Sequence, residues 1–292
     1  MTRGVRFILT RDPSEFGART EHFLAGRIEC NVLATVLLNV LDGVYPDSSA
    51  LFGYGLDDGD EVVFAALRTP PHPLLASPLE LSGVEPLESG ADEFVELWLD
   101  ADPEVGGVTS VPGTAQAIAA AWERRTHGAA RRTLREAAHV LEEVQDPPRP
   151  ARGELRLPNP SERALLVDWT REFVVEAGLT GAAQIEAMVD GRLRRDGLFV
   201  WDDELPVSLV GITQEVAGIV RIGPVYTPPA QRGRGYAGSA VAAVSRRALA
   251  RGARRCMLYT DLDNPTSNKI YAEVGYRRTL DWEELAFEPA GE

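Results

Sequence analysis

The sequence is poor in the residue types that build metal centres and disulfide frameworks. Its 292 residues include two cysteines, Cys30 and Cys256, which lie far apart and lack the spacing of metal ligands. So few cysteines favour a reduced, cytoplasmic setting. The four histidines all precede residue 150 and form neither a zinc-binding pattern nor a Ser-His-Asp arrangement. We therefore expect no bound metal.

Long apolar runs are also missing. No stretch approaches the roughly 20 apolar residues of a membrane span, and no run of signal-peptide length follows the first residues. These absences predict a cytoplasmic protein without a membrane partner. Apolar residues still make up 44% of the chain, which is enough for an ordinary globular core.

Positive charge is scarce except in one stretch. The chain has 44 acidic and 30 basic residues, and Lys269 is its only lysine. This acidic balance argues against nucleic acid as a partner. Residues 216–260, in contrast, contain eight arginines and no Asp or Glu. Such an island indicates a site for a polyanionic ligand, and an arginine-rich solvated helix face is the alternative interpretation.

That stretch has the pattern of a strand, a break, a glycine-rich loop and an amphipathic helix. Ile219, Val220 and Ile222 are branched and apolar, as in a strand. Gly223-Pro224 interrupts them, because proline donates no ladder hydrogen bond. A bulge at this point would splay the neighbouring strands and free a backbone edge, although a plain edge-strand bulge fits the same residues. Small and apolar residues then recur at helical spacing over 237–248.

The loop before the helix has a phosphate-binding composition. Gly233 and Gly235 let consecutive backbone N–H groups point inward, and the helix behind them adds the positive end of its dipole. With Gly238 they also spell the dinucleotide fingerprint G-x-G-x-x-G, so a dinucleotide-dependent oxidoreductase is one hypothesis. Two features count against it. Pro228-Pro229 separates the strand from the glycines, and the 54 residues after Gly238 are too few for a doubly wound sheet.

Two motifs together resemble the GNAT superfamily of acyltransferases. The first resembles its acetyl-CoA loop, and the second resembles its closing strand, helix and strand. The first motif is Gln231-Arg232-Gly233-Arg234-Gly235-Tyr236-Ala237. The second motif is Tyr259-Thr260-Asp261-x-x-Asn264-Pro265-x-x-Asn268-x-x-Tyr271-x-x-x-Gly275-Tyr276. The resemblance covers residues 153–287. It implies the α+β GNAT fold with a mixed α/β sheet, and N-acetyltransferase activity with acetyl-CoA as co-substrate and no metal.

The resemblance also implies roles for single residues. The backbone of Val225 and Tyr226 would contact the pantetheine arm, and Asn264 and Asn268 would hold it. Tyr271 would be the general acid that protonates the departing thiolate. The pyrophosphate would lie on the loop formed by Gln231, Arg232, Gly233, Arg234, Gly235, Tyr236 and Ala237.

Each of these roles has a plainer structural interpretation. Tyr271 fits an amphipathic core position, and Asn264 followed by proline fits a helix N-cap. No general base is assigned, because residues 217–225 contain no carboxylate, and Asp261 and Asp263 fit turn positions equally well. A non-catalytic acyl-CoA-binding regulatory protein therefore remains an alternative.

The chain is expected to contain two domains. The proline-rich segment 146–153 predicts a semi-rigid linker between a first domain, 1–145, and a second, 154–292. A strand at 107–111, then Pro112, a helix and Gly128, matches the order of elements near the C-terminus. The first domain therefore resembles a degenerate GNAT-like copy, since no glycine-rich loop precedes residue 150. Residues 131–143 fit either a strand or a helix.

The elements of the second half are more sharply defined. We expect a helix over 161–177 capped by Ser161, a helix over 182–195, and strands at 198–201 and 207–213. The acceptor is expected to be a small-molecule amine or a peptide amine. The sequence leaves the oligomeric state open, a homodimer included.

Overall fold

The computed structural model describes residues 5–44, 49–83, 87–179 and 185–291. Its contacts divide the chain into two compact units. The first unit comprises Met1–Glu136 together with Leu280–Glu292, and the second comprises Ala137–Thr279.

The first unit is a mixed sheet with four α-helices among its described residues. Its strands follow the order β1-β2-β3-β4-β5-β12-β6, in which β12 is Arg277–Glu288 and β6 is Ala129–Leu141. The core lies between the sheet and helices α3 and α4, where Phe64, Phe94 and Trp98 pack with Trp122 and Phe287. In chain order the elements are β1 (Arg6–Thr10), α1 (Pro13–Leu24), α2 (Asn31–Leu41), β2 (Leu51–Leu56), β3 (Val62–Arg68), β4 (Leu74–Ala76), α3 (Leu87–Ala101), β5 (Gly107–Ser110) and α4 (Pro112–Thr126).

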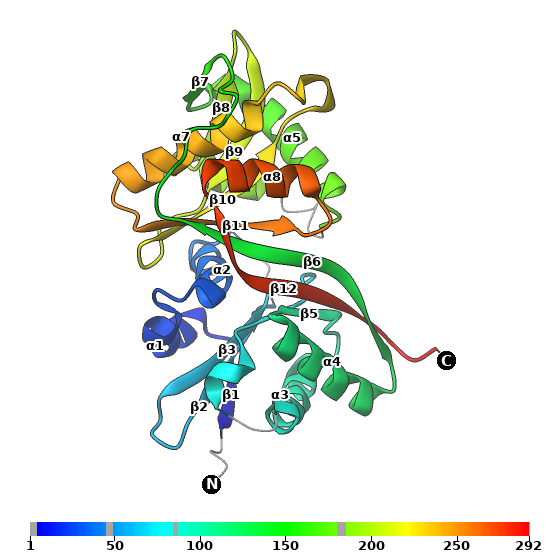
Figure 1. The fold of residues 1–292 in the computed structure, drawn as a ribbon. Helices are drawn as coiled ribbons and strands as arrows, with labels where there is room; N and C mark the ends of the chain where they lie inside the picture. The colour runs from blue at the N-terminus through cyan, green and yellow to red at the C-terminus, as the bar shows by residue number, and fades with distance from the viewer. Residues whose placement is uncertain (1–4, 45–48, 84–86, 180–184, 292) are drawn as a thin grey trace. The chain divides into compact units, whose positions relative to one another are not determined.

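The second unit has helices on both faces of its sheet (Figure 1). Its strands follow the order β6-β11-β10-β9-β8-β7. One core contains residues of α7 and α8, and the other contains residues of α5 and α6. In chain order the elements are β7 (Glu154–Arg156), α5 (Arg163–Glu176), α6 (Ile185–Leu193), β8 (Leu198–Asp202), β9 (Pro206–Ile212), β10 (Ile219–Tyr226), α7 (Tyr236–Ala250), β11 (Arg255–Asp261) and α8 (Pro265–Val274).

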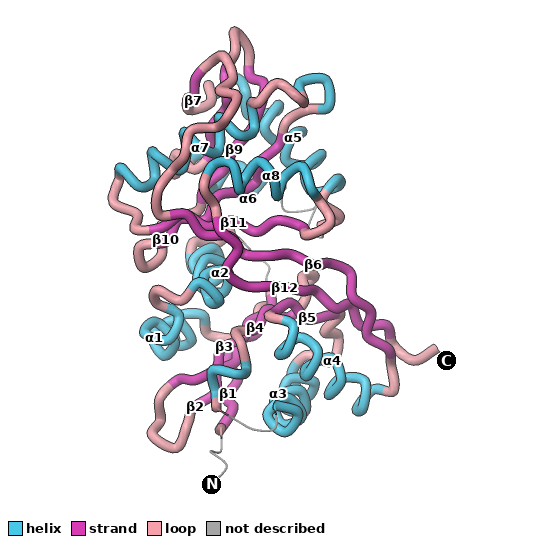
Figure 2. Tube along the Cα trace, in the orientation of Figure 1, coloured by secondary structure: helices cyan, strands magenta, loops and turns pink. Residues whose placement is uncertain are grey.

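The two units repeat one order of elements: a strand, two helices, three strands, a helix, a strand and a helix. The strand that closes each copy belongs to the sheet of the other. β12 (Arg277–Glu288) pairs antiparallel with β5, and β6 (Ala129–Leu141) lies next to β11. Figure 2 shows these two long strands, along which the chain passes from one unit into the other. Residues 131–143, which fitted a strand or a helix, are mostly strand.

Because β6 and β12 each pass into the sheet of the other copy, the boundary between the two units does not lie at the expected linker. The compact units part within β6 and within β12, not at residues 146–153. The proline-rich segment forms neither helix nor strand, and it is fastened to the second unit. Ala151 N–H donates to Ser239 Oγ of α7 at 2.9 Å, and Trp201 Nε1 donates to the carbonyl of Arg152 at 2.7 Å.

Some local expectations differ from the structure. The helix expected to start at a Ser161 cap is α5, and it is preceded by a short 3-10 turn with Asn159 as its cap. Asn159 and Glu162 form a reciprocal capping box, which satisfies two backbone donors where a lone serine satisfies one. The second helix begins at Ile185 as α6, and expected positions 182–184 lie outside the described residues. Strand β1 was not predicted.

Candidate functional site

The centre of the site is a split between two parallel strands of the second unit. β10 and β11 pair only over Ile219–Arg221 and Arg255–Met257. Toward β9 the register of β10 shifts between Ile222 and Val225, so Gly223-Pro224 stands opposite the single residue Gly211. The predicted bulge at Gly223-Pro224 is therefore confirmed. Beyond it, among the described residues, β10 has an edge that β11 does not cover.

Two hydrogen bonds show which residue faces that open edge. The carbonyl of Tyr226 accepts from Ser208 Oγ of β9 at 3.0 Å, and the carbonyl of Thr227 accepts from Arg232 Nε at 2.8 Å. Successive residues of a strand direct their N–H and C=O groups to opposite edges. Since Tyr226 faces β9, Val225 faces the open edge. Of the two residues predicted to contact a pantetheine arm, Val225 is the better placed.

The glycine-rich loop lies between β10 and α7. Gly233 and Gly235 have φ values of 77° and 81°, in the left-handed region that glycine tolerates best. No side chain caps α7 at Gly235, and the first backbone bond of the helix runs from Ser239 N–H to the Gly235 carbonyl at 3.0 Å. The N–H groups of the first helical turn therefore have no intrahelical acceptor. With the helix dipole they form a site for an anion.

The side chains of the loop do not all point to this anion site. Arg232 contacts Glu176 of α5, with Nη2 donating to its carboxylate at 2.6 and 2.9 Å, and its guanidinium lies 5.8 Å from the ring centre of Tyr226. Tyr236 donates to Asp203 at 2.6 Å, which raises the pKa of its phenol. The loop therefore presents its backbone N–H groups to an anion, whereas the charge of Arg232 is directed to Glu176.

The asparagines of the second motif hold the turn between β11 and α8. Asn264 is the N-cap of α8, with Oδ1 accepting from Ser267 N–H at 3.0 Å, so the capping interpretation is confirmed. Asn268 Nδ2 donates to the carbonyls of Asp261 at 3.0 Å and Asn264 at 2.9 Å. Asp261 in turn accepts from Asp263 N–H at 2.8 Å, which is a turn contact. None of these contacts tests the predicted role of either asparagine as a holder of the pantetheine arm.

Tyr271 lies on the buried face of α8. The residue is 9% exposed, and it belongs to the core that contains α7. Burial is the main reason that its pKa is raised to about 12, so the phenol keeps its proton throughout the physiological range. A group in that state can donate a proton and cannot accept one. Its predicted role as a general acid stays a prediction.

The structure adds carboxylates that sequence reasoning missed. Glu172 and Glu176 lie one turn apart on α5, and Tyr226 Oη donates to Glu172 at 2.8 Å. Burial and this contact raise the pKa of Tyr226 to about 12. The i, i+4 spacing of the two glutamates was the available signal, but nothing in the sequence assigned that face of the helix to β10.

Two buried amide oxygens fit an acyl-CoA-type ligand. Among the described residues, Gln231 Oε1 and Asn268 Oδ1 have no hydrogen-bond partner. Buried polar atoms normally have one. An N–H donor on a ligand would satisfy either oxygen, and the amides of a pantetheine arm are donors of that kind. No cluster of three or more possible metal-ligating side chains exists in the described part of the chain.

The corresponding place in the first unit is occupied by the chain itself. Ser110 Oγ donates to the carbonyl of Ala76 at 2.8 Å, which links the ends of β5 and β4. At the start of α4, Thr114 Oγ1 accepts from Leu79 N–H at 2.6 Å and donates to Glu80 at 2.7 Å. Glu80 belongs to the segment between β4 and α3, which is the counterpart of the glycine-rich loop between β10 and α7. A carboxylate in that segment supports the degenerate character expected for the first copy.

Comparisons with known proteins agree with this geometry. Residues 163–276 match the model of the acetyltransferase (GNAT) family. The chain resembles a tandem GNAT protein from the clavulanic acid biosynthesis pathway, with 14% identity, a TM-score of 0.60 and 99% of each chain covered. It also resembles a GCN5-related N-acetyltransferase from Sphaerobacter thermophilus, with 20% identity, a TM-score of 0.55, and 98% of this chain and 97% of that chain covered. No curated protein sequence matches the chain.

Identities this low establish the fold alone, and the family model adds the sequence relationship. The strand order of the second unit is not that of a doubly wound parallel sheet, which removes the structural basis of the oxidoreductase hypothesis. Among the described residues no helix is long and apolar enough to cross a membrane. The chain therefore has the fold of tandem GNAT proteins, and its residues 163–276 belong to the GNAT acetyltransferase family.

Proposed function

We propose that the second unit transfers the acetyl group of acetyl-CoA to a primary amine, on a small molecule or a peptide, by direct attack in a ternary complex. The observation that carries this proposal is the open edge of β10 after its bulge, next to a helix N-terminus with unpaired N–H groups. An anion site and an unpaired strand edge side by side suit a ligand that has a pyrophosphate and an amide-bearing arm.

The residues divide the work of binding. The N–H groups of the loop at 232–237 bind the pyrophosphate, with Gln231 beside them. Val225 pairs with the pantetheine arm as a neighbouring strand would, and an N–H of this segment polarises the thioester carbonyl. Asn264 and Asn268 hold the arm from the other side. Acetyl-CoA supplies the activated acetyl group and a thiolate leaving group.

Tyr271 acts as the general acid in this proposal. Its phenol is protonated at neutral pH, because burial raises its pKa to about 12, so it donates its proton to the departing sulfur. The acceptor enters as the neutral amine, and the proton that its nitrogen loses on forming the amide passes to water. No carboxylate on β10 takes the role of base, since the strand carries neither Asp nor Glu.

Calorimetric titration with acetyl-CoA tests the proposal, with a nicotinamide dinucleotide as the comparison ligand. Gly233→Ala and Gly252→Ala form a matched pair of variants. Both glycines have positive φ, and a Cβ would meet nothing within 4 Å at either, so both variants strain the backbone without a steric clash. They differ in place, because Gly252 follows the far end of α7 and Gly233 lies in the loop.

We expect acetyl-CoA to bind the native protein and Gly252→Ala equally. Gly233→Ala should bind it at least about tenfold more weakly, because one lost anion contact costs on the order of 1.4 kcal/mol. Binding of the nicotinamide dinucleotide alone, or equal affinity of all three proteins for acetyl-CoA, would refute the assignment of the loop. A panel of amines then identifies the acceptor by turnover.

A non-catalytic acyl-CoA-binding protein is the second candidate. The observation that favours it is the absence of a carboxylate from β10. The two candidates differ in one measurement, because a binding protein takes up acetyl-CoA and releases no free thiol with any amine.

A further inference from the structure

An arginine from α6 reaches the bulge of β10. Arg192 Nη1 donates a hydrogen bond to the carbonyl oxygen of Gly223. That carbonyl belongs to the first of the two residues that stand opposite Gly211 of β9. A bulge interrupts the ladder and leaves backbone groups without strand partners. Arg192 supplies a charged donor to one of them.

The glycine on the neighbouring strand makes room for this contact. A Cβ at Gly211 would overlap Arg192 Nη1, and it would also lie 2.8 Å from the Gly223 carbonyl oxygen and 2.9 Å from Pro224 Cδ. Gly211 has no positive φ, so its backbone does not require glycine. Glycine is required at position 211 because the guanidinium of Arg192 and the bulge of β10 occupy the space that a Cβ would fill.

The position of the bulge matters because of the residue that follows it. Pro224 has no N–H group, so Val225 carries the first backbone donor after the Gly223 carbonyl. Val225 faces the open edge of β10, whereas Tyr226 faces β9. The orientation of the Gly223 peptide and that of the Val225 N–H are therefore coupled through a single rigid residue.

We propose that Arg192 is a positioning residue that holds the bulge so that the Val225 N–H points at the thioester carbonyl of a bound acyl-CoA. The inference rests on the proposed function. It assigns to α6 a part in catalysis that does not touch the ligand, acting through the Gly223 carbonyl. Loss of Arg192 should therefore impair polarisation of the thioester and leave the binding of the pyrophosphate nearly unchanged.

The infrared stretching frequency of a labelled thioester carbonyl measures this polarisation directly. Acetyl-CoA carrying ¹³C at the acetyl carbonyl is bound to the full-length protein, and its stretch is compared with that of free acetyl-CoA. A hydrogen bond lowers the frequency. Four variants are measured: Arg192→Met, Arg192→Lys, Gly211→Ala and the control Arg194→Ala, which changes an exposed arginine two residues further along. Thermal melting confirms that each variant is folded.

We expect a lowered frequency in the native protein and in Arg194→Ala. In Arg192→Met and Gly211→Ala the frequency should return toward that of free acetyl-CoA, while Kd rises less than about threefold. Arg192→Lys should recover part of the shift, because lysine keeps one charged donor. For an amine that is turned over, kcat should fall roughly 10- to 100-fold in Arg192→Met, which is less than the loss of a donor that touches the reacting oxygen.

The outcomes distinguish a failure of the role inferred for Arg192 from a failure of the proposed function. A native protein that binds no acetyl-CoA overturns the proposed function and this inference with it. A native protein that binds acetyl-CoA with a lowered frequency, together with a folded Arg192→Met that shows the same frequency, overturns the inference alone. If Arg192→Met does not fold, Gly211→Ala decides, because it keeps the arginine and crowds both its guanidinium and the bulge, and an unchanged frequency there overturns the inference.

Discussion

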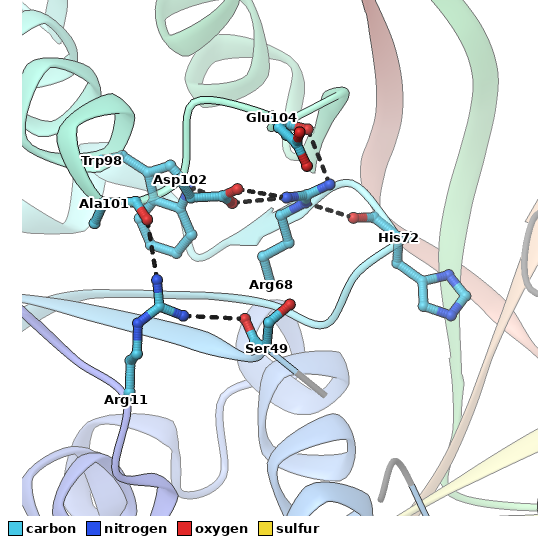
Figure 3. Close-up of polar contacts among 8 residues, drawn as sticks. All are labelled: Arg11, Ser49, Arg68, His72, Trp98, Ala101, Asp102 and Glu104. Atoms are coloured by element: carbon cyan, nitrogen blue, oxygen red, sulfur yellow. Dashed lines mark hydrogen bonds and ion pairs between the residues drawn. The ribbon is translucent and has the colours of Figure 1, made fainter. Parts of the chain in front are cut away.

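Arg68 donates hydrogen bonds to both carboxylate oxygens of Asp102, at 2.7 and 2.8 Å, in the first unit (Figure 3). The rest of the guanidinium is also satisfied, because Nε donates to the carbonyl of His72 and Nη2 to that of Glu104. Trp98 Nε1 adds a donor to Asp102 at 3.2 Å. Arg68 is 6% exposed, so this network fastens the end of β3 to the segment between α3 and β5 in the interior.

Removal of the carboxylate should destabilise the first unit strongly. Asp102→Ala leaves a buried guanidinium without its counter-ion, and such changes cost about 3–5 kcal/mol. The exposed pair Arg6–Asp60 supplies the control, and Arg6→Ala, which leaves the left-handed backbone of Asp60 unchanged, should cost less than about 1 kcal/mol. Urea unfolding measures both. Equal losses for the two variants would show that the Arg68 network adds nothing beyond a surface ion pair.

Tyr271→Phe should separate binding from chemistry. It keeps the buried ring and removes the acidic proton, so kcat should fall roughly 10²- to 10⁴-fold while Kd for acetyl-CoA stays within about threefold. Tyr276→Phe is the control. It alters the same core, where Tyr276 Oη bonds to Ser245 Oγ at 2.8 Å, and it should lower stability without a selective loss of kcat. A collapse of acetyl-CoA binding in Tyr271→Phe would contradict the role of acid.

The assignment of Tyr271 as the general acid also predicts how turnover depends on pH. Because the pKa of Tyr271 is raised to about 12, its ionisation begins to remove the acid only near that pH. Turnover should therefore not decline between pH 7 and 10 on account of this group. A fall of kcat with an apparent pKa near the ordinary value of 10, absent from Tyr271→Phe, would show that the phenol is not buried in the working enzyme.

Arg232→Ala should have little effect on the affinity for acetyl-CoA, despite the place of Arg232 in the loop. Its guanidinium pairs with Glu176 and lies over Tyr226, and both partners of this ion pair are nearly half exposed. We expect Kd to rise less than about threefold, since exposed pairs contribute at most about 1 kcal/mol. A loss as large as that of Gly233→Ala would mean that the side chain turns to the phosphates when the ligand binds.

The sequence predicted what depends on neighbours along the chain. The glycines of the loop, the Asn264 cap and the interruption at Gly223-Pro224 are local signals, and the structure contains the left-handed glycines, the cap and the bulge. The fold class and the family followed from the order of two such motifs. These features required no knowledge of the tertiary arrangement.

What the sequence could not show are contacts between elements far apart along the chain. The hydrogen bond from Arg192 to Gly223 spans 31 residues, and that from Tyr226 to Glu172 spans 54. The exchange of β6 and β12 is a choice of partner strand, and the residues of a strand do not specify its neighbour. For the same reason the proline-rich segment suggested a linker, although its backbone is fastened to α7 and β8.

Acidification should reveal the ion pair that fastens β7. Arg156 contacts both Glu162 and Asp202, and the bond from Arg156 is the main reason that the pKa of Glu162 lies below its usual value of 4.5. A carboxylate whose pKa is lowered by folding adds stability that is fully present above the unfolded value. That contribution is lost as the pH falls through the lower, folded value.

Glu162→Gln isolates this charge, because glutamine can keep the capping box with Asn159. At pH 7 the variant should be less stable by roughly 1.5–3 kcal/mol, the usual contribution of a hydrogen bond to a charged group. The difference from the native protein should shrink below pH 4.5 and vanish at lower pH, where the native carboxyl is protonated. Glu186→Gln, in an exposed pair with Arg163, should show a much smaller loss at pH 7. Urea unfolding at a series of pH values tests this, and a difference between Glu162→Gln and the native protein that does not vary with pH would assign the loss to packing and not to charge.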